Sequence, residues 1–268
     1  MTRPDRVALV TGGSSGLGAA ICRALTAKGW RVWAGSRSAR SPADGVRAVP
    51  MDVTDPHAVR AAVASILAKE GRLDTVICNA GVQVSAPTEE LPEDRAAAIL
   101  DTNLRGTIHT IRAALPALRE SGGSIVAVGS LAGRVAPPGE AVYAASKHGL
   151  RGFLESLRHE VRPQGVRVAL VEPGYIRTAL AQGDAPDWPT ISAYDDIRTR
   201  LRQHLRAAID AGMAPDTVAD GIAKLAEASD PPFCTPVGAS ATWVPRLKQV
   251  LPARLFFRIV ASRFGIAE

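Results

Sequence analysis

Residues 6–18 read RVALVTGGSSGLG, an apolar run that passes into a turn containing four glycines. The apolar run predicts a short buried strand, and the amphipathic pattern after the turn predicts a helix that ends near Lys28. Glycines at such a junction let the backbone approach a phosphate closely, while the helix N-terminus offers unpaired N–H groups and a positive dipole. The spacing Gly12-x3-Gly16-x-Gly18 differs from the G-x-G-x-x-G of the common dinucleotide fingerprint. The turn therefore predicts a phosphate site, with a tight turn that binds no ligand as the alternative.

The same alternation of short apolar runs and helical stretches continues to about residue 174. Alternation of this kind is typical of a parallel sheet with helices on both faces. The sequence thus predicts an α/β fold, with a single doubly wound parallel sheet of the Rossmann type in one domain over residues 1–268. Further strands are expected at residues 31–36, 46–50, 73–78, 124–128 and 166–171, and helices at 56–69, 95–120 and 141–161.

Composition narrows the class of protein. The 268 residues are 46% hydrophobic and 22% charged, as is usual for a globular domain, and the net charge of +6 permits binding to phosphates or acidic partners. Basic residues are dispersed and only 4% of residues are aromatic, so no nucleic-acid module is expected. Cys22, Cys78 and Cys234 are widely spaced and predict neither a metal site nor a disulfide framework. With no signal peptide or bilayer-spanning run in view, we expect a cytoplasmic protein.

Tyr143 and Lys147 form the pair that carries the predicted chemistry. They are four residues apart in a predicted helix, so a phenol and an ammonium share one face. A tyrosine ordinarily titrates near pH 10, and a fixed cation beside it lowers its pKa. The pair predicts a proton donor and acceptor that works closer to neutral pH. Taken alone, the same spacing is also common on a solvated helix face.

The sequence resembles the short-chain dehydrogenase/reductase family over about residues 5–180, with the motifs in the family's order and spacing. Residues 78–82 and 171–174 look most like those of hydroxysteroid and retinol dehydrogenases. The resemblance implies an oxidoreductase that acts on a ketone, an aldehyde or the corresponding alcohol of an apolar small molecule. The motifs that carry it are Thr11-Gly12-x3-Gly16-x-Gly18, Asp52-Val53, Asn79-Ala80-Gly81, Asn103, Ser130, Tyr143-x3-Lys147 and Pro173-Gly174-x-Ile176-x-Thr178.

The resemblance also implies catalytic roles. Tyr143 would protonate the carbonyl oxygen as the pro-S hydride of the cofactor reaches the carbon, and Ser130 would hydrogen-bond the same oxygen. Lys147 would lower the pKa of Tyr143 and bind the nicotinamide ribose. Asn103 would help to hold a water in a proton relay to Lys147, with an ordinary buried asparagine as the alternative.

The end of the second predicted strand bears on cofactor choice. Sites that prefer NAD place an acidic residue there, whereas NADP sites omit it and supply an arginine. Here the position is Ser36, followed by Arg37, and no Asp or Glu occurs from Gly12 to Ala43. We therefore predict NADP(H) and no metal. The expected cofactor-binding residues are Gly12, Ser14, Ser15, Gly16, Leu17, Gly18, Ser36, Arg37, Asp52, Val53, Asn79, Ala80, Gly81, Tyr143, Lys147, Pro173, Gly174, Ile176 and Thr178.

The C-terminal third departs from the alternating pattern. The resemblance implies a substrate lid at about residues 179–213, where Trp188 and Tyr194, with Tyr175 just before it, are candidates for contact with an apolar substrate. Residues 239–268 form a basic amphipathic extension that Pro252 should split into two short helices. Packing of this extension on its own domain or on a second subunit is favoured, with an anionic membrane surface as the alternative.

Other readings remain at this stage. The resemblance implies a homo-oligomer, a dimer or tetramer, that pairs the helices at 95–120 and 141–161. One functional alternative is redox-assisted isomerisation or epimerisation at the same site, with the cofactor retained. Another is a non-catalytic NADP-binding sensor or scaffold. The presence of Ser130, Tyr143 and Lys147 together argues against the sensor, because a sensor has no need of a proton donor. The substrate and the physiological direction stay open.

Overall fold

The computed structural model describes residues 6–178 and 187–266, and its centre is a seven-stranded parallel sheet. The strand order is β3-β2-β1-β4-β5-β6-β7, so the winding direction reverses between the neighbours β1 and β4. In such sheets ligands bind at the carboxyl edge beside the reversal. The prediction of a doubly wound Rossmann-type sheet is confirmed. The strands are β1 (Val7–Thr11), β2 (Arg31–Ser36), β3 (Val46–Pro50), β4 (Thr75–Cys78), β5 (Ser124–Val128), β6 (Arg167–Pro173) and β7 (Cys234–Val237).

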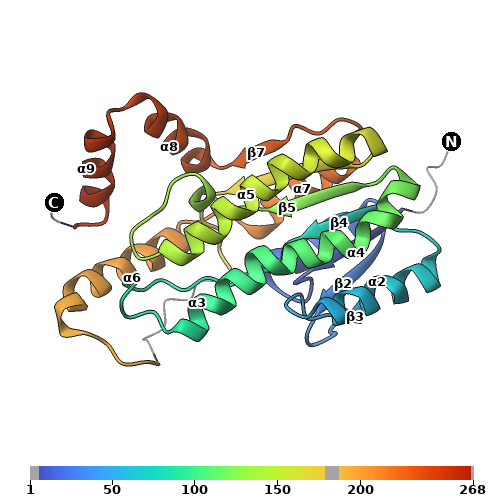
Figure 1. The fold of residues 1–268 in the computed structure, drawn as a ribbon, viewed down its shortest axis with the longest axis horizontal. Coiled ribbons are helices and arrows are strands. Elements are labelled where there is room, and N and C mark those ends of the chain that lie inside the picture. Colours follow the sequence, from blue (N-terminus) through green and yellow to red (C-terminus); the bar gives the residue numbers. More distant parts are fainter. Residues whose placement is uncertain (1–5, 179–186, 267–268) are drawn as a thin grey trace.

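Helices cover both faces of the sheet (Figure 1). On one face α1 (Gly16–Ala27) packs beside α7 (Pro215–Glu227), and on the other α2 (Pro56–Glu70) packs beside α4 (Gly106–Ser121), with α5 (Ala141–Val161) next to them. This arrangement explains why the inner strands β1, β4 and β5 are buried at every position: helices cover both of their faces.

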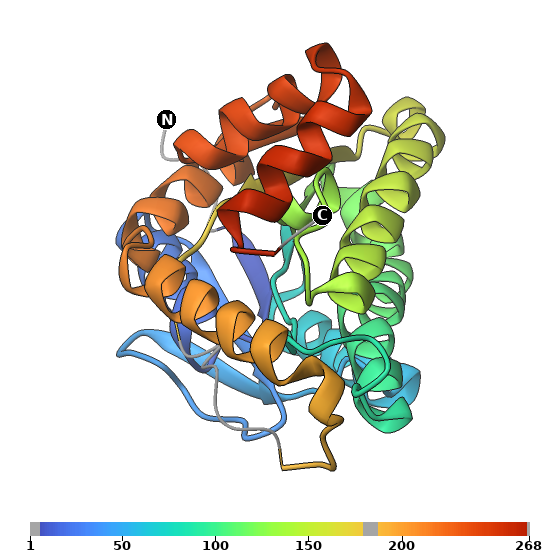
Figure 2. The same ribbon diagram turned by 90° about the vertical axis from the view of Figure 1, so that its left-hand side faces the viewer.

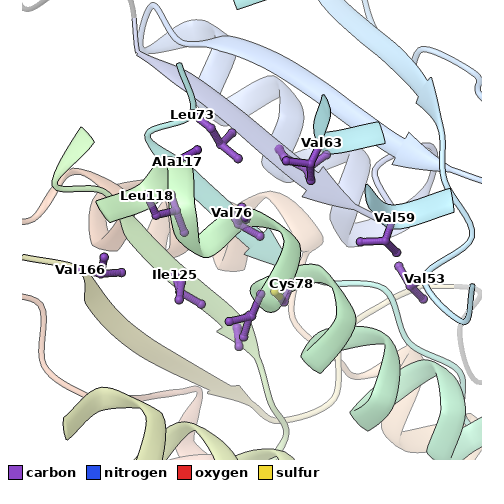
Figure 3. Close-up of a cluster of buried hydrophobic side chains, with 14 of the residues drawn as sticks. Val53, Val59, Val63, Leu73, Val76, Cys78, Ala117, Leu118, Ile125 and Val166 are labelled. Atoms are coloured by element: carbon purple, nitrogen blue, oxygen red, sulfur yellow. The ribbon is translucent and has the colours of Figure 1, made fainter. Parts of the chain in front are cut away.

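Each face of the sheet has its own core. Successive residues of β1 point in opposite directions, so Leu9 belongs to the core under α2, α4 and α5, and Val10 to the core under α1 and α7. Figure 3 shows the first of these cores, where Leu118 of α4 lies near Val76 of the sheet and Val59 of α2 lies near Val53. Burying each such side chain contributes about 1.5–3 kcal/mol. Two cores of this kind fix the sheet that positions the site.

The structure differs from the sequence prediction at three elements. The helix expected at 95–120 consists of α3 (Glu93–Leu100), a π-helical turn at Asp101–Arg105, and α4. The helix α7 and the strand β7 were not predicted. The strand is short, only half-buried and contains Pro236, features that suit the edge of a sheet and give a weak sequence signal.

The C-terminal extension forms two helices that lie at the carboxyl end of the sheet, α8 (Ala239–Val250) and α9 (Ala253–Arg263), and the predicted division at Pro252 is confirmed. Figure 2 looks onto this end, where α9 lies next to α6 (Asp195–Asp210). The rings of Phe264 and His204 are 3.9 Å apart there. Packing on the rest of the protein is partial, because Phe256 is buried while Trp243 and Val250 are 60% and 75% exposed. In the described part of the chain, no helix has the length and apolarity needed to cross a membrane.

Candidate active site

The glycine turn after β1 forms an open cradle. A Cβ atom on Gly18 would lie 2.1 Å from the carbonyl oxygen of Gly12, so only glycine fits there. Gly12 itself has φ of 63°, a conformation that side chains rarely adopt. The Ser15 side chain does not cap α1, so the helix presents its first N–H groups and its positive dipole to the cavity in front of it. These features fit the pyrophosphate of a dinucleotide.

Hydrogen bonds tie this turn to the end of β4. The N–H groups of Asn79 and Ala80 both donate to the Thr11 hydroxyl at 3.0 Å, and the Asn79 side chain donates back to the Thr11 carbonyl at 3.0 Å. Two neighbouring strand ends at the reversal of the sheet are thus held together. The segment Asn79–Gly81, expected to pass beside the adenosine ribose, lines the same cavity as the glycine turn.

One cavity of about 1530 Å³ occupies the carboxyl edge of the sheet. It runs from the glycine turn past Tyr143 to α6 and α9, and it brings together every predicted catalytic and cofactor-binding residue except Asn103. Residues as far apart in the sequence as Gly12 and Thr178 therefore line one space. This cavity is large enough for a dinucleotide and a small substrate together.

Three polar groups meet near the middle of the cavity. Tyr143 and Lys147 lie on one face of α5, and Ser130 follows the end of β5. The Lys147 ammonium donates to the Val128 carbonyl at 2.9 Å and lies 5.7 Å from the centre of the Tyr143 ring. The Ser130 hydroxyl accepts from the Ala132 N–H at 3.0 Å, which fixes it at the start of a short 3-10 turn. A carbonyl group could be held between Ser130 and Tyr143.

Burial, rather than Lys147, dominates the electrostatics of Tyr143. Burial raises the pKa of the phenol above its usual range, a hydrogen bond with Ser130 opposes the shift, and the charge of Glu140 adds to it. The pKa of Lys147 is itself lowered to about 8 by burial. The prediction that Lys147 brings the Tyr143 pKa towards neutrality is therefore wrong for the protein alone, because the cavity desolvates both groups. Tyr143 keeps its proton at neutral pH.

Asn103 lies in the π-helical turn and is fully buried. Its side chain accepts from the Val82 N–H at 2.8 Å and donates to the Val82 carbonyl at 2.9 Å and to the Ser146 hydroxyl at 3.0 Å. Both amide hydrogens are thus used by the protein, and the side chain links the chain after β4 to α5. π-turns are often found at functional sites. The role expected for Asn103 in holding a water stays a prediction.

The far end of the cavity, at β2, is polar. Ser36 and Arg37 line it, together with Asp52 after β3. The Asp52 carboxylate accepts from the N–H and the hydroxyl of Thr54 at 2.9 and 2.8 Å. The Thr54 N–H makes the largest contribution to lowering the pKa of Asp52, and the nearby Arg37 charge also lowers it. No acidic side chain occupies the position of Ser36, where it would repel a 2′-phosphate.

The sequence did not single out several residues that line the cavity near Tyr143. Glu140 and Gln83 are the polar ones, and their environment is built from separate parts of the chain. The only available signal for Glu140 was its place three residues before Tyr143. Of the three aromatic residues expected to contact substrate, Tyr175 lines the cavity, whereas Trp188 and Tyr194 do not.

The expected lid falls partly outside the described residues, since 179–186 are not among them. The remainder, 187–213, is anchored at its start and its end. Arg198 of α6 forms an ion pair of 2.6 Å with buried Glu90, which also accepts from the Ile191 N–H at 2.7 Å. At the other end the Met213 N–H donates to the Tyr175 carbonyl at 3.0 Å.

Sequence comparison now identifies the family. A profile described as short chain dehydrogenase matches residues 6–188, and the chain belongs to this family. It is therefore an oxidoreductase by family, and members of the family use a nicotinamide cofactor.

Individual relatives agree with this assignment. The chain is 30% identical over 265 residues to a 3-ketodihydrosphingosine reductase of Bacteroides thetaiotaomicron, covering 95% of this chain and 98% of the relative. It is 33% identical to 17-beta-hydroxysteroid dehydrogenase type 1 of Homo sapiens, covering 80% of this chain and 72% of the relative. A short-chain dehydrogenase structure from Streptomyces avermitilis superimposes with a TM-score of 0.81 at 32% identity, covering 98% and 99% of the two chains. A short-chain dehydrogenase structure from Burkholderia cenocepacia in complex with NADP superimposes with a TM-score of 0.77 at 28% identity. The match covers 95% of this chain and 97% of that chain.

Proposed function

We propose that the protein is an NADP(H)-dependent carbonyl reductase that reduces a ketone or aldehyde of an apolar small molecule. The observation that carries this proposal is the meeting of Ser130, Tyr143 and Lys147 in the same cavity as the glycine turn. A proton donor, a hydroxyl that can position an oxygen and a cation beside a dinucleotide cradle are the groups that carbonyl reduction requires.

Ser130, Tyr143 and Lys147 would each have a separate role in the reaction. Ser130 would hydrogen-bond the carbonyl oxygen of the substrate and orient it towards Tyr143. Tyr143 would donate its proton to that oxygen as the carbon accepts a hydride. The pKa of Tyr143 lies well above neutral pH, so the phenol carries the proton that it would donate. Lys147 would replace the proton at Tyr143, and its pKa of about 8 suits a group that both holds and passes a proton near neutrality.

The cofactor would lie between the glycine turn and Lys147, and when bound it supplies the hydride. Gly12, Gly16 and Gly18 would admit its pyrophosphate, and Asn79–Gly81 would flank the adenosine ribose. The choice of NADP rests on Ser36 and Arg37, since an arginine without a neighbouring acid can bind a 2′-phosphate through charge-assisted hydrogen bonds. The Burkholderia structure in complex with NADP agrees with this choice.

An apolar substrate is supported by the inner wall of the cavity. Side chains from α8 and α9 contribute to it, and the relatives named for a ketodihydrosphingosine and a hydroxysteroid act on substrates that such a wall would suit. For the described part of the expected lid, residues 187–213, we propose that it covers this part of the cavity and is held through Arg198 and Glu90. The apolar residues from the extension that line the cavity are Val244, Leu247, Leu251, Phe256, Ile259, Val260 and Phe264.

The proposal extends to assembly, with a homo-oligomer paired through α4 and α5. Small residues at Ala145, Gly149 and Gly152 are exposed along α5 and would allow a second helix to approach closely. Light scattering that shows only monomer at micromolar concentration would exclude this assembly.

The proposed reaction is tested by incubating the protein with NADPH and a panel of apolar ketones and following the loss of nicotinamide absorbance. The Tyr143→Phe variant removes only the phenolic hydroxyl. We expect it to lose about 10²- to 10⁴-fold in kcat, the usual contribution of general acid catalysis, while NADPH affinity stays within a few-fold. Near-normal kcat for this variant on a ketone that the wild type reduces would exclude Tyr143 as the proton donor.

A further inference from the structure

Glu140 is a carboxyl group that the proposed reaction leaves unused. It lies at the start of α5, three residues before Tyr143, and only 5% of its surface is exposed. What remains accessible faces the cavity, whose lining includes Glu140, Gln83, Tyr143 and Tyr175. Its charge is close enough to raise the pKa of both tyrosines. Glu140 thus lies beside the place where the carbonyl group of a substrate would be held.

Within the described part of the chain, this carboxyl has no cationic partner. The nearby Gln83 side chain lowers its pKa without supplying a charge, and no ion pair to Glu140 is found among residues 6–178 and 187–266. Lys147, the nearest lysine in the sequence, donates instead to the Val128 carbonyl. A carboxylate can accept about four hydrogen bonds, so most of its capacity remains open towards the cavity. Burying such a group in its charged form without a charged partner is costly, and a cationic group on a ligand would offset that cost.

We propose that Glu140 is a specificity-determining residue that binds a protonated amine close to the reacting carbonyl of the substrate. The inference rests on the proposed carbonyl reduction and adds to it the class of substrate: an amino ketone that carries an extended apolar chain. An amine is favoured over other polar groups because it supplies both the missing positive charge and several N–H donors, and the low dielectric of the cavity strengthens that pairing.

The opposite side of the cavity supports the rest of this substrate. Leu247, Leu251 and Phe256 of the C-terminal extension line it without a carboxylate of their own, since no Asp or Glu occurs from Pro231 to Ala267. The cavity therefore has one buried acid beside the catalytic groups and an apolar wall formed by α8 and α9. A molecule with a cationic amine beside its carbonyl and an alkyl chain beyond it matches both features.

The test compares three ketones with one alkyl chain: an α-amino ketone, the α-hydroxy ketone and the unsubstituted ketone. The wild type is expected to show a kcat/KM at least about tenfold higher for the amino ketone, the size of effect expected for a hydrogen-bonded charge. Glu140→Gln should abolish that preference while changing kcat/KM for the unsubstituted ketone by no more than a few-fold. Glu160→Gln, the same change at an exposed position of α5, is the control and should retain the preference.

Binding of a long-chain amino alcohol, measured by titration calorimetry in the presence of NADP, gives a readout that does not depend on turnover. It should weaken at least about tenfold in Glu140→Gln and not in Glu160→Gln. Equal kcat/KM for all three ketones, or a preference that survives Glu140→Gln, would overturn the inference while leaving carbonyl reduction intact. A preference for the hydroxy ketone would also overturn it and would show that Glu140 acts as a neutral donor. Failure to reduce any ketone, with amine binding retained, would instead count against the proposed reaction alone.

Discussion

Replacing Glu140 with glutamine should stabilise the protein, and only above about pH 4.5. Burial raises the pKa of Glu140 from 4.5 to about 7, with the Gln83 hydrogen bond opposing the shift. The folded protein therefore holds the proton more tightly than the unfolded chain does. The stability that Glu140 contributes by holding this proton is fully present below pH 4.5. It is lost as the pH rises through about 7. Glutamine has nearly the same shape and no charge to bury, so it avoids that loss.

The magnitude follows from the two pKa values. Each pH unit between 4.5 and about 7 corresponds to about 1.4 kcal/mol, so the ionised carboxylate costs about 3 kcal/mol at alkaline pH. At pH 5, only about half a pH unit above the unfolded pKa of 4.5, the folded protein still holds the proton and the cost is about 1 kcal/mol. The free energy of unfolding of Glu140→Gln, relative to wild type, should therefore be about 2–3 kcal/mol higher at pH 8 than at pH 5.

Urea unfolding of the wild type and the variant at the two pH values measures this difference. The pH dependence of every other group cancels between the two proteins, and Glu160→Gln, on the exposed end of α5, should show no pH-dependent difference from wild type. An equal effect of Glu140→Gln at both pH values would refute the reasoning, because it would mean that Glu140 titrates as it does in the unfolded chain. A stabilising variant that loses substrate preference would show that Glu140 is retained for function at a cost in stability.

The remaining predictions concern the two ends of the cavity. Arg37→Ala should raise the Kd for NADPH about tenfold and leave the Kd for NADH unchanged, since it removes one charge-assisted contact to the 2′-phosphate. Equilibrium fluorescence measures both Kd values. Arg40 lies outside the cavity, so Arg40→Ala is the control. Loss of affinity for both cofactors would contradict the assignment of Arg37 to the 2′-phosphate. Deleting the residues after Thr242 should lower the melting temperature, because buried Phe256 and the wall of the cavity go with them. An unchanged melting curve, with loss of binding to anionic vesicles, would instead identify the extension as a membrane-surface element.

The sequence predicted the sheet well because its signals are local. Strands buried on both faces are apolar without a break, and each is followed by glycines or polar residues at the carboxyl edge, as in Val7–Thr11 and Ser124–Val128. The π-turn at Asp101–Arg105 was missed because one extra residue in a turn hardly changes the hydrophobic pattern of a long helix. The strand Cys234–Val237 was missed because an edge strand with half-buried residues lacks the continuous apolar signal.

The sequence predicted which residues belong to the site, but it did not predict how their surroundings shift their pKa values. The four-residue spacing correctly indicated that Tyr143 and Lys147 share a helix face, yet spacing says nothing of how far water is excluded. Burial reverses the expected direction of the Tyr143 shift. Glu140 escaped notice for the same reason: its neighbours Gln83 and Tyr175 come from other segments, and only the folded cavity shows that a carboxyl group has been buried among them.

Hydride transfer is the central claim, and isotope transfer tests it most directly. NADPH that carries deuterium at the pro-S position of the nicotinamide is incubated with the protein and an apolar α-amino ketone, and the product is examined by mass spectrometry. We expect an alcohol that has gained one deuterium at the former carbonyl carbon, and no such product with Tyr143→Phe over the same time. A converted substrate without deuterium, with the label still in the cofactor, would contradict net reduction and indicate isomerisation at the same site.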